Sequence, residues 1–459
     1  MLFYLWQLGG VGLLGPDEPR YASIGRAMAA TGDWITPRLD GQPWFEKPPL
    51  TYWLTDAGHR LRLSDEWAAR LPQELLSVLF LCFYFQVLAR EFSLRLATAA
   101  TAILATSAGW FAYSFAALTD LPMSVALGAA MLITLFDTRP KRGWWAGAFL
   151  GFAILAKGFV PLVLFAPLFL IARGKRLAVI AGAIIVAAPW YGLCWIRNGH
   201  AFWDDFFWKQ HVARFLTPSL EHVQPWWFYV PVLLAGLFPW TPLAALLFRR
   251  RIYDDSRLVL LMGWVLYGFL FFSVARNKLP GYLLPLLPVA GIVLAAGLEK
   301  LKGREYWLAA CAVMLVALPS VIALLPNALL AGVSRTSLRF LPVGLFFLVL
   351  AGVVWWLAHK DWMDCAVIAI AVATAICITY GKYHTFPRLD QTVSVRGFWR
   401  ANRAAVDAGC FDYVNRTWEY GLNYYAGHAL PECGASPPGP HIEVRDRRLA
   451  VKAAPQELR

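Results

Sequence analysis

The chain has 459 residues, of which 59% are hydrophobic and only 15% are charged. Soluble domains are about 45–50% apolar and about 25% charged, so this composition excludes an ordinary soluble protein and indicates one built largely for lipid. The formal net charge is +13, but the basic residues form short clusters between apolar runs. Membrane topology signals have this pattern, which argues against a nucleic-acid-binding surface.

An apolar run over residues 1–14 comes first. A spanning helix needs about 17–25 residues, so this run is too short to cross a membrane alone. It lacks the basic segment and the small-residue cleavage site of a signal peptide. We expect it to be the end of a first spanning helix that starts upstream.

Residues 15–72 are more polar and are predicted to form a large loop at the membrane surface. In DEPRYASIGRAMAATGDW, residues Tyr21, Ile24 and Met28 have near-helical spacing, which predicts an amphipathic helix lying on the membrane. The following TPRLDGQPWFEKPPLTYWL has four prolines and an Asp40-Gly41 turn. We expect an irregular crossing there, followed by a second interfacial helix.

Further apolar runs of roughly spanning length follow, which brings the expected total to about thirteen spans. Every second loop between them carries Lys or Arg, so the positive-inside rule predicts that these loops are cytoplasmic and that the others, including 15–72, are external. The runs lie at 73–89, 96–116, 119–136, 144–156, 158–172, 177–196, 227–248, 258–275, 282–298, 306–325, 340–358 and 363–381.

The composition changes again in the tail, where strand-like stretches and SPPGP replace the apolar runs. The sequence therefore predicts an all-α polytopic membrane protein over residues 1–381 and a small C-terminal extracytoplasmic domain over 382–459. Cys410 and Cys433 would lie in an oxidising compartment, where they could pair. Two cysteines alone leave both a disulfide and free thiols open.

Charged residues interrupt several of the predicted external loops. Charges at membrane depth are costly and indicate function, and these all fall at one predicted face although they are far apart in the chain. Acids mixed with cations at such a face suggest a phosphate-bearing lipid ligand, with Lys and Arg donating to the phosphate. The residues are Asp17, Glu18, Arg20, Glu46, Lys47, Asp120, Lys157, Arg276 and Lys278.

Each of these residues also has a structural interpretation. Asp17 could cap a helix, Glu18 could favour the helix dipole, and Arg20 could pair with an acid of its own helix. A lysine or arginine at an interface often only extends its charged end towards water. The sequence leaves these alternatives open for each residue.

Five stretches in chain order carry a resemblance. DEPRYASIGRAMAATGDWITPRLDGQPWFEKPPLTYWL is similar to the first external loop of bacterial aminoarabinose transferases and their relatives. LTDLPM, LAKGFVPLVL, KQHVARF with the following HVQPWWFYVPVLLAGLFPW, and ARNKLPGYLLPLLP match the same group. The chain thus resembles the dolichyl-phosphate-mannose-protein mannosyltransferase superfamily, which are GT-C integral-membrane glycosyltransferases.

The resemblance implies a polyprenyl-phosphate sugar donor used at the periplasmic face of a bacterial inner membrane. It gives catalytic roles to Asp17 and Asp120. It places Glu46, Lys47, Lys157, Arg276 and Lys278 at the substrate, and we add Arg20 and Glu18 as substrate-binding candidates. The tail is much shorter than in the aminoarabinose transferases, which leaves the acceptor open.

The expected function is sugar transfer from the donor to a lipid A-like or other envelope acceptor. The alternatives are a protein O-mannosyltransferase and, from another class, a lipid-linked sugar transporter. A transporter should show internal repeats and charges deep within several spans, and the chain shows neither. Membrane lipids and the donor are the expected partners, with no nucleic acid. No cofactor is required, although a divalent metal at the acids is conceivable.

Overall fold

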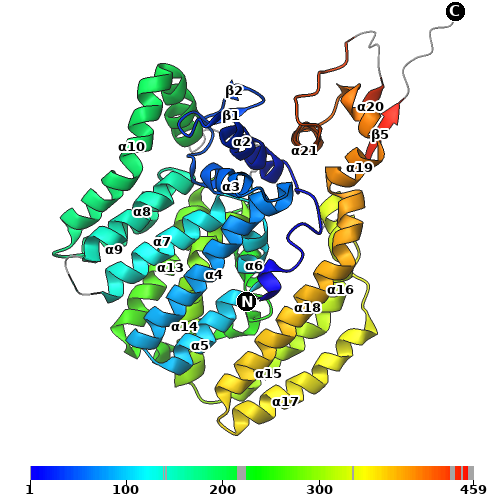
Figure 1. Ribbon diagram of the computed structural model, residues 1–459. Helices are drawn as coiled ribbons and strands as arrows, with labels where there is room; N and C mark the ends of the chain where they lie inside the picture. The colour runs from blue at the N-terminus through cyan, green and yellow to red at the C-terminus, as the bar shows by residue number, and fades with distance from the viewer. Residues whose placement is uncertain are drawn as a thin grey trace, which may run out of the picture.

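The computed structural model describes residues 2–137, 139, 142–213, 224–332, 335–434, 440–445 and 448–452. Helices dominate it, and Figure 1 shows them as a bundle with α2 (Asp17–Thr31) and α3 (Leu50–Arg60) lying across one end. The three-stranded sheet belongs to the tail beyond that end. The predicted all-α polytopic class is confirmed.

The bundle helices follow the predicted apolar runs closely. They are α4 (Asp65–Glu91), α5 (Leu94–Thr106), α6 (Ala108–Phe115), α7 (Asp120–Phe136), α8 (Gly143–Lys157), α9 (Val160–Ile171), α10 (Arg176–Phe202), α12 (Tyr229–Gly236), α13 (Ser256–Val274), α14 (Leu287–Lys300), α15 (Arg304–Met314), α16 (Leu318–Ala331), α17 (Phe347–His359) and α18 (Met363–Thr392). A π-helix, η2 (Trp203–Ala213), continues α10. The 3-10 segments are η3 (Thr241–Phe248), η4 (Arg250–Asp254), η5 (Pro280–Leu286), η6 (Leu315–Ala317) and η8 (Pro342–Phe346).

Fewer helices in the described part of the chain qualify as membrane spans by length and composition than the sequence predicted. Among the described residues, 7 helices are long and apolar enough to span, or up to 9 if each bent pair counts as one. Helices α7, α8 and α9 are apolar but shorter. The expected count of thirteen spans is therefore not confirmed. The apolar helices do show that the chain is an integral membrane protein.

The first apolar run differs from its prediction. Helix α1 covers only Leu2–Leu5, and the chain then forms turns and extended backbone up to α2. Arg70 of α4 explains this path, since its guanidinium donates to the carbonyl oxygens of Leu8, Val11 and Gly12. Carbonyls that accept from a side chain here are not paired along a helix.

The loops rich in Lys and Arg meet at the end of the bundle opposite α2 and α3. Contacts join several of them: Arg257 donates to the carbonyl of Glu91, Ser93 donates to Glu299, and Arg304 pairs with Asp361. The loops that the sequence predicted to be cytoplasmic thus lie together at one end of the bundle.

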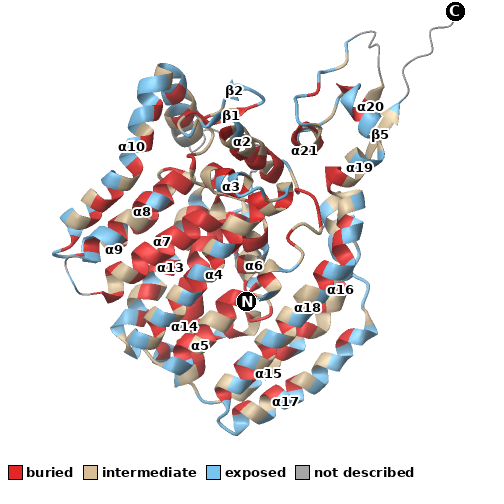
Figure 2. Ribbon diagram, in the orientation of Figure 1, coloured by how far each residue is buried: buried red, intermediate tan, exposed pale blue. Residues whose placement is uncertain are grey.

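The bundle core is apolar and lies around α7 and α14, both buried along most of their length (Figure 2). The exposed large apolar side chains lie mostly on the outer helices, such as α10 and α17. This inverted pattern suits a lipid surrounding, where an apolar exterior costs nothing.

The surface loop between α1 and α4 has the predicted order. After α2, the short strands β1 (Arg38–Leu39) and β2 (Gln42–Pro43) pair in antiparallel register. The Asp40-Gly41 turn joins them with positive φ at both residues, as a tight two-residue hairpin needs. Gly25 lets α2 pack closely on α3, because a Cβ there would lie 2.5 Å from Cβ of Thr55.

Helix α18 continues past residue 381 to Thr392, and the elements of the tail follow it. It contains α19 (Val395–Ala401), α20 (Arg403–Asp407) and α21 (Arg416–Ala426) beside a sheet of order β3-β4-β5. Strand β3 (Cys410–Asp412) pairs in parallel with β4 (His441–Arg445), and β4 pairs antiparallel with β5 (Arg448–Lys452).

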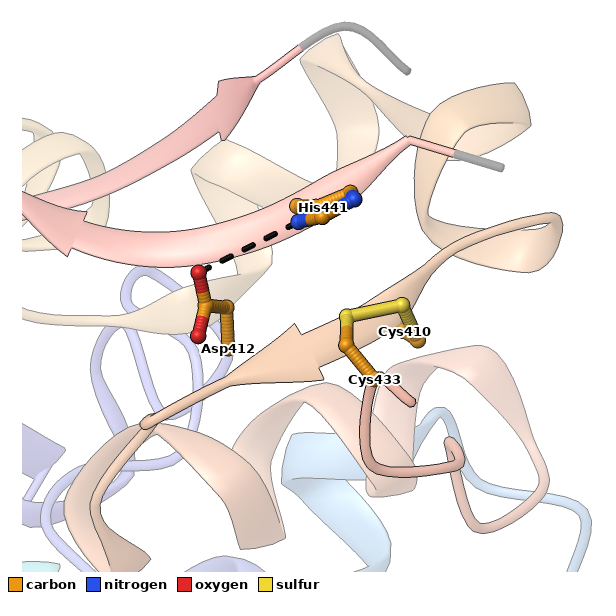
Figure 3. Close-up of a disulfide and its surroundings, with 4 residues drawn as sticks. All are labelled: Cys410, Asp412, Cys433 and His441. Carbon is orange, nitrogen blue, oxygen red and sulfur yellow. Dashed lines mark ion pairs between the residues drawn. A yellow bond between two sulfur atoms is a disulfide. The ribbon is translucent and has the colours of Figure 1, made fainter. Parts of the chain in front are cut away.

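Cys410 and Cys433 form a disulfide, which resolves the alternative left open by the sequence. Figure 3 shows it at the edge of β3, with the ion pair between Asp412 and His441 on the neighbouring strands. The disulfide joins β3 to the segment that follows α21 and so closes the tail around that helix.

Candidate functional site

Helix α2 brings three of the candidate residues to the end of the bundle. It begins at Asp17 after Pro16, with Asp17 and Glu18 in the first turn, where carboxylates interact favourably with the helix dipole. It ends at Gly32, whose φ of 71° closes the last turn. Successive residues of its first turn face different surroundings, and this separates their roles.

Glu18 lies in the interior and is 1% exposed. Its two oxygens accept from Arg70 Nε and Nη2 at 2.7 and 2.8 Å, and the backbone N–H groups of Leu14 and Ala117 donate to it as well. Arg70 is itself fully buried. The geometry therefore assigns Glu18 to holding the bundle together and gives no support to the substrate-binding role expected for it.

Arg20 connects two of the candidate acids. Its Nη2 lies 2.5 Å from Asp17 Oδ1, and its Nη1 lies 3.0 Å from Glu46 Oε2. The guanidinium is buried, which disfavours its charge, but Glu46, followed by Tyr21 and Asp17, outweighs burial and raises the pKa of Arg20. Asp17 keeps 46% of its side chain exposed, so one face of this cluster stays open.

Glu46 and Lys47 come directly before the two prolines that precede α3. Lys47 Nζ lies 3.4 Å from Glu46 Oε1, so Glu46 stands between Arg20 on one side and Lys47 on the other. Proline restricts the backbone of the residue before it, which limits the positions that Lys47 can take.

A second charged pair comes from two bundle helices. Asp120 is the first residue of α7, Lys157 is the last of α8, and their side chains form an ion pair. Lys157 Nζ also lies 4.8 Å from the ring centroid of Tyr282. Gly281 provides the room, because a Cβ there would lie 2.6 Å from Asp120 Oδ1.

One cavity of about 150 Å³ joins these groups. Its wall combines cations and an acid with apolar side chains, as an ionic headgroup attached to a hydrocarbon would require. The lining residues are Glu46, Lys47, Pro48, Met123, Lys157, Val160, Phe206, Gln210, Phe271, Phe272, Ala275, Arg276, Asn277 and Tyr282.

Four of the predicted substrate-binding residues, Glu46, Lys47, Lys157 and Arg276, therefore meet at one cavity. Asp17 and Arg20 connect to it through Glu46, and Asp120 connects through Lys157. Tyr282, Gln210 and Asn277 also line the cavity, although they were not among the candidate residues named from the sequence.

Lys278 lies next to this cavity but does not line it. Its Nζ donates to the backbone carbonyls of Ala275 and Gln224, and burial lowers the pKa of its ammonium group. It faces a neighbouring cavity of about 610 Å³, which shares Arg276 with the first. Of the two basic residues in the RNKLP stretch, Arg276 is the one placed to reach a ligand in the cavity that Glu46, Lys47 and Lys157 line.

The acids of the site are distributed among cations. Asp17 and Glu46 share Arg20, and Asp120 pairs with Lys157. Among the residues that the structure describes, no group of three or more His, Cys, Asp or Glu side chains could hold a metal ion. That the reaction requires no cofactor stays a prediction from the sequence.

Comparison with known proteins gives a family match and close relatives. The model of the dolichyl-phosphate-mannose-protein mannosyltransferase family matches residues 46–194. An undecaprenyl phosphate-alpha-4-amino-4-deoxy-L-arabinose arabinosyl transferase of Edwardsiella ictaluri is 33% identical over 66% of this chain and 59% of its own length. The corresponding transferase 1 of Sodalis glossinidius is 35% identical over 66% of this chain and 57% of its own. The chain spans somewhat less than two thirds of these curated relatives.

Two solved structures share the fold. Crystal structures of ArnT from Cupriavidus metallidurans, one bound to undecaprenyl phosphate and one in the apo state, give TM-scores of 0.74 and 0.73. They are 23% and 22% identical to this chain, cover 95% and 93% of it, and are themselves covered over 84% and 82%. The resemblance read from the sequence motifs is confirmed, and so is the GT-C membrane fold.

Proposed function

We propose that this chain, an aminoarabinose transferase-like protein with the GT-C membrane fold, is a glycosyltransferase that takes its sugar from a polyprenyl-phosphate donor. The observation that carries the proposal is the cavity of about 150 Å³, where Lys47, Lys157 and Arg276 face an otherwise mainly apolar space. Three cations suit a phosphate, and the apolar wall suits the first part of a prenyl chain. The names of the curated relatives support the same donor class.

The donor phosphate would be the leaving group. The bond between the anomeric carbon and the phosphate oxygen breaks, and the negative charge that develops on that oxygen is stabilised by Lys47 and Arg276. Asp120 holds Lys157 by an ion pair, so we propose that it orients this cation rather than touching the sugar. The acceptor oxygen attacks from the opposite face and inverts the anomeric centre.

Asp17 is the candidate group on the acceptor side. It is the most exposed carboxylate of the Arg20 cluster, and its charge is held in place by that arginine. With a hydroxyl acceptor, the proton passes from the attacking oxygen to Asp17 as general base. With a lipid phosphate acceptor, no proton has to leave, and Asp17 orients the reacting groups instead.

The favoured acceptor is a lipid A-like molecule, in line with the relatives named as aminoarabinose transferases. The family description favours a second candidate, a protein hydroxyl, because the matched family is named for protein mannosyltransferases. We place the reaction at the periplasmic face of a bacterial inner membrane, because the charged site lies at the end opposite the basic loops.

Mass spectrometry of envelope lipids and glycoproteins from cells with and without this gene tests the proposal. A lipid A-like species that loses one sugar mass in the deletion strain supports the favoured acceptor. A glycopeptide that loses a sugar identifies the second candidate. Unchanged lipids and glycoproteins, together with an accumulated lipid-linked sugar on one membrane face, would favour transport instead.

A further inference from the structure

The tail helix α21 lies directly against the charged site, although more than three hundred residues separate the two in sequence. Figure 1 shows α21 beside α2 at the same end of the bundle, and the two helices pack together. One face of α21 turns towards the tail core through Trp418 and Leu422. The other face turns towards the surface loop.

Three residues of that second face, spaced as one helical stripe, meet the loop. Tyr420 joins the buried apolar cluster of α2 and α3. Asn423 Nδ2 donates to Asp40 Oδ2 at 3.3 Å, and the Tyr424 hydroxyl donates to Asp65 Oδ1 at 3.0 Å. Arg26 of α2 completes the contact by donating to the backbone carbonyl of Tyr424 at 2.7 Å.

Tyr420 reaches the site itself through Arg20. The Arg20 guanidinium carbon lies 5.6 Å from the Tyr420 ring centroid, and the rings of Tyr21 and Trp44 lie at 5.2 and 5.7 Å. Arg20 Nε is buried and finds no hydrogen-bond partner among the described residues. Aromatic rings, together with the two carboxylates, therefore fix the position of this side chain.

We propose that Tyr420 is a positioning residue of the site and that the tail is part of the donor-binding machinery. By packing on Arg20, Tyr420 keeps the guanidinium between Asp17 and Glu46. Arg20 and Lys47 both contact Glu46, so Arg20 shares the negative charge that Lys47 faces. When Arg20 moves away, the charge of Glu46 acts on Lys47 alone, and Glu46 competes more strongly with the phosphate for that cation. This inference rests on the proposed function, because it takes a polyprenyl phosphate as the ligand.

The test measures binding of undecaprenyl phosphate to the full-length protein in nanodiscs. Tyr420→Ala should weaken binding by about 3- to 20-fold, the loss expected for a buried cation–π contact. Tyr420→Phe keeps the ring and should bind as the wild type does. Tyr413→Ala, at a fully exposed tyrosine of the same tail, is the matched control and should have no effect.

A double-mutant cycle separates positioning from general support of the tail. In an Arg20→Gln background, Tyr420→Ala should weaken binding no further. Effects of the two substitutions that simply add, or a Tyr420→Ala variant that binds like the wild type, would overturn the inference.

A second measurement does not depend on the donor. Labelling of arginines by phenylglyoxal, followed by mass spectrometry, should be slow at Arg20 in the wild type and in Tyr420→Phe but faster in Tyr420→Ala. A wild-type protein that binds no undecaprenyl phosphate would contradict the proposed function. The labelling rates would then still decide whether Tyr420 positions Arg20, and equal rates in all variants would overturn that contact.

Discussion

Two neighbouring carboxylates in the first turn of α2 differ in their surroundings. Glu18 is paired inside the bundle with Arg70, whereas Asp17 remains about half exposed at the site. The helical turn causes this difference, since adjacent residues on a helix point about 100° apart. The sequence GPDEPRYA contains both acids but does not show which one faces inwards.

Asp17→Asn tests the reactive carboxylate. The change keeps size but removes the proton-accepting strength, so transfer to a hydroxyl acceptor should fall by ~10²–10⁴-fold, the range for a general base. Binding of undecaprenyl phosphate should stay close to that of the wild type. Single-turnover transfer from a labelled donor measures the effect, with Asp407→Asn on the tail as control. Near-wild-type turnover would leave Asp17 only a helix-starting role.

Glu18→Gln should behave in the opposite way. It removes one partner of a buried ion pair and leaves the Arg70 charge uncompensated, which costs roughly 3–5 kcal/mol of stability. Thermal unfolding in detergent should show a clearly lowered midpoint, while the protein that remains folded retains donor binding. A Glu18→Gln protein with normal stability and lost donor binding would return this residue to the substrate-binding group.

Lys47→Ala tests the phosphate site. Loss of a hydrogen bond to a charged group costs roughly 1.5–3 kcal/mol, so undecaprenyl phosphate should bind about 10- to 150-fold more weakly. Lys360→Ala, at the opposite end of the bundle, controls for the loss of one positive charge. Unchanged affinity in folded Lys47→Ala protein would remove Lys47 from the donor site.

Apolar runs predicted the helices of the bundle well but not their breaks. The run 96–116 divides into α5 and α6 with a 57° bend, and the run 227–248 divides into α12 and η3 with a 118° bend. A helix that is apolar on all sides has no periodicity to show where it turns. The contact of Arg70 with the carbonyls after α1 could not be predicted from the sequence either, because it joins segments far apart in the chain.

The tail is the element whose role was hardest to foresee. Its separate composition was visible, but the contact of Tyr420 with Arg20 depends on how α21 docks. The disulfide holds that arrangement by closing a loop between residues 23 positions apart. The paired replacement of Cys410 and Cys433 by serine should destabilise the tail by about 3 kcal/mol.

Limited proteolysis would measure that loss, since an opened tail is cut faster. Cys365→Ser, a free and exposed cysteine of α18, is the matched control. Equal cleavage rates for the serine pair, the control and the wild type would mean that the packing of α21 alone holds the tail.

At the scale of the whole molecule, the basic loops and the candidate site lie at opposite ends of the bundle. The alternation of basic loops predicted which loops lie together, and the structure brings them to one end of the bundle. The candidate residues meet at the other end because their positions follow the ends of helices that run in alternating directions. The meeting of Glu46, Lys47, Lys157 and Arg276 at one cavity was predictable in outline from topology, whereas the pairing of individual acids and cations was not.

The predicted orientation places the tail outside the cytoplasm. A reporter fused to the C-terminus and active only after export should be active, and the same reporter placed after Arg251 should be silent. The reverse pattern would place the site at the cytoplasmic face and contradict the proposed compartment.

Transfer by the purified protein tests the central claim most directly. The protein in nanodiscs is given an undecaprenyl-phosphate donor with a labelled sugar, and lipid A or a Ser/Thr-rich peptide as acceptor. We predict that the label moves to lipid A with the opposite anomeric configuration and that free undecaprenyl phosphate appears in equal amount. A protein that binds undecaprenyl phosphate but moves label to neither acceptor, with donor consumed no faster than in empty nanodiscs, would contradict the assignment as a glycosyltransferase.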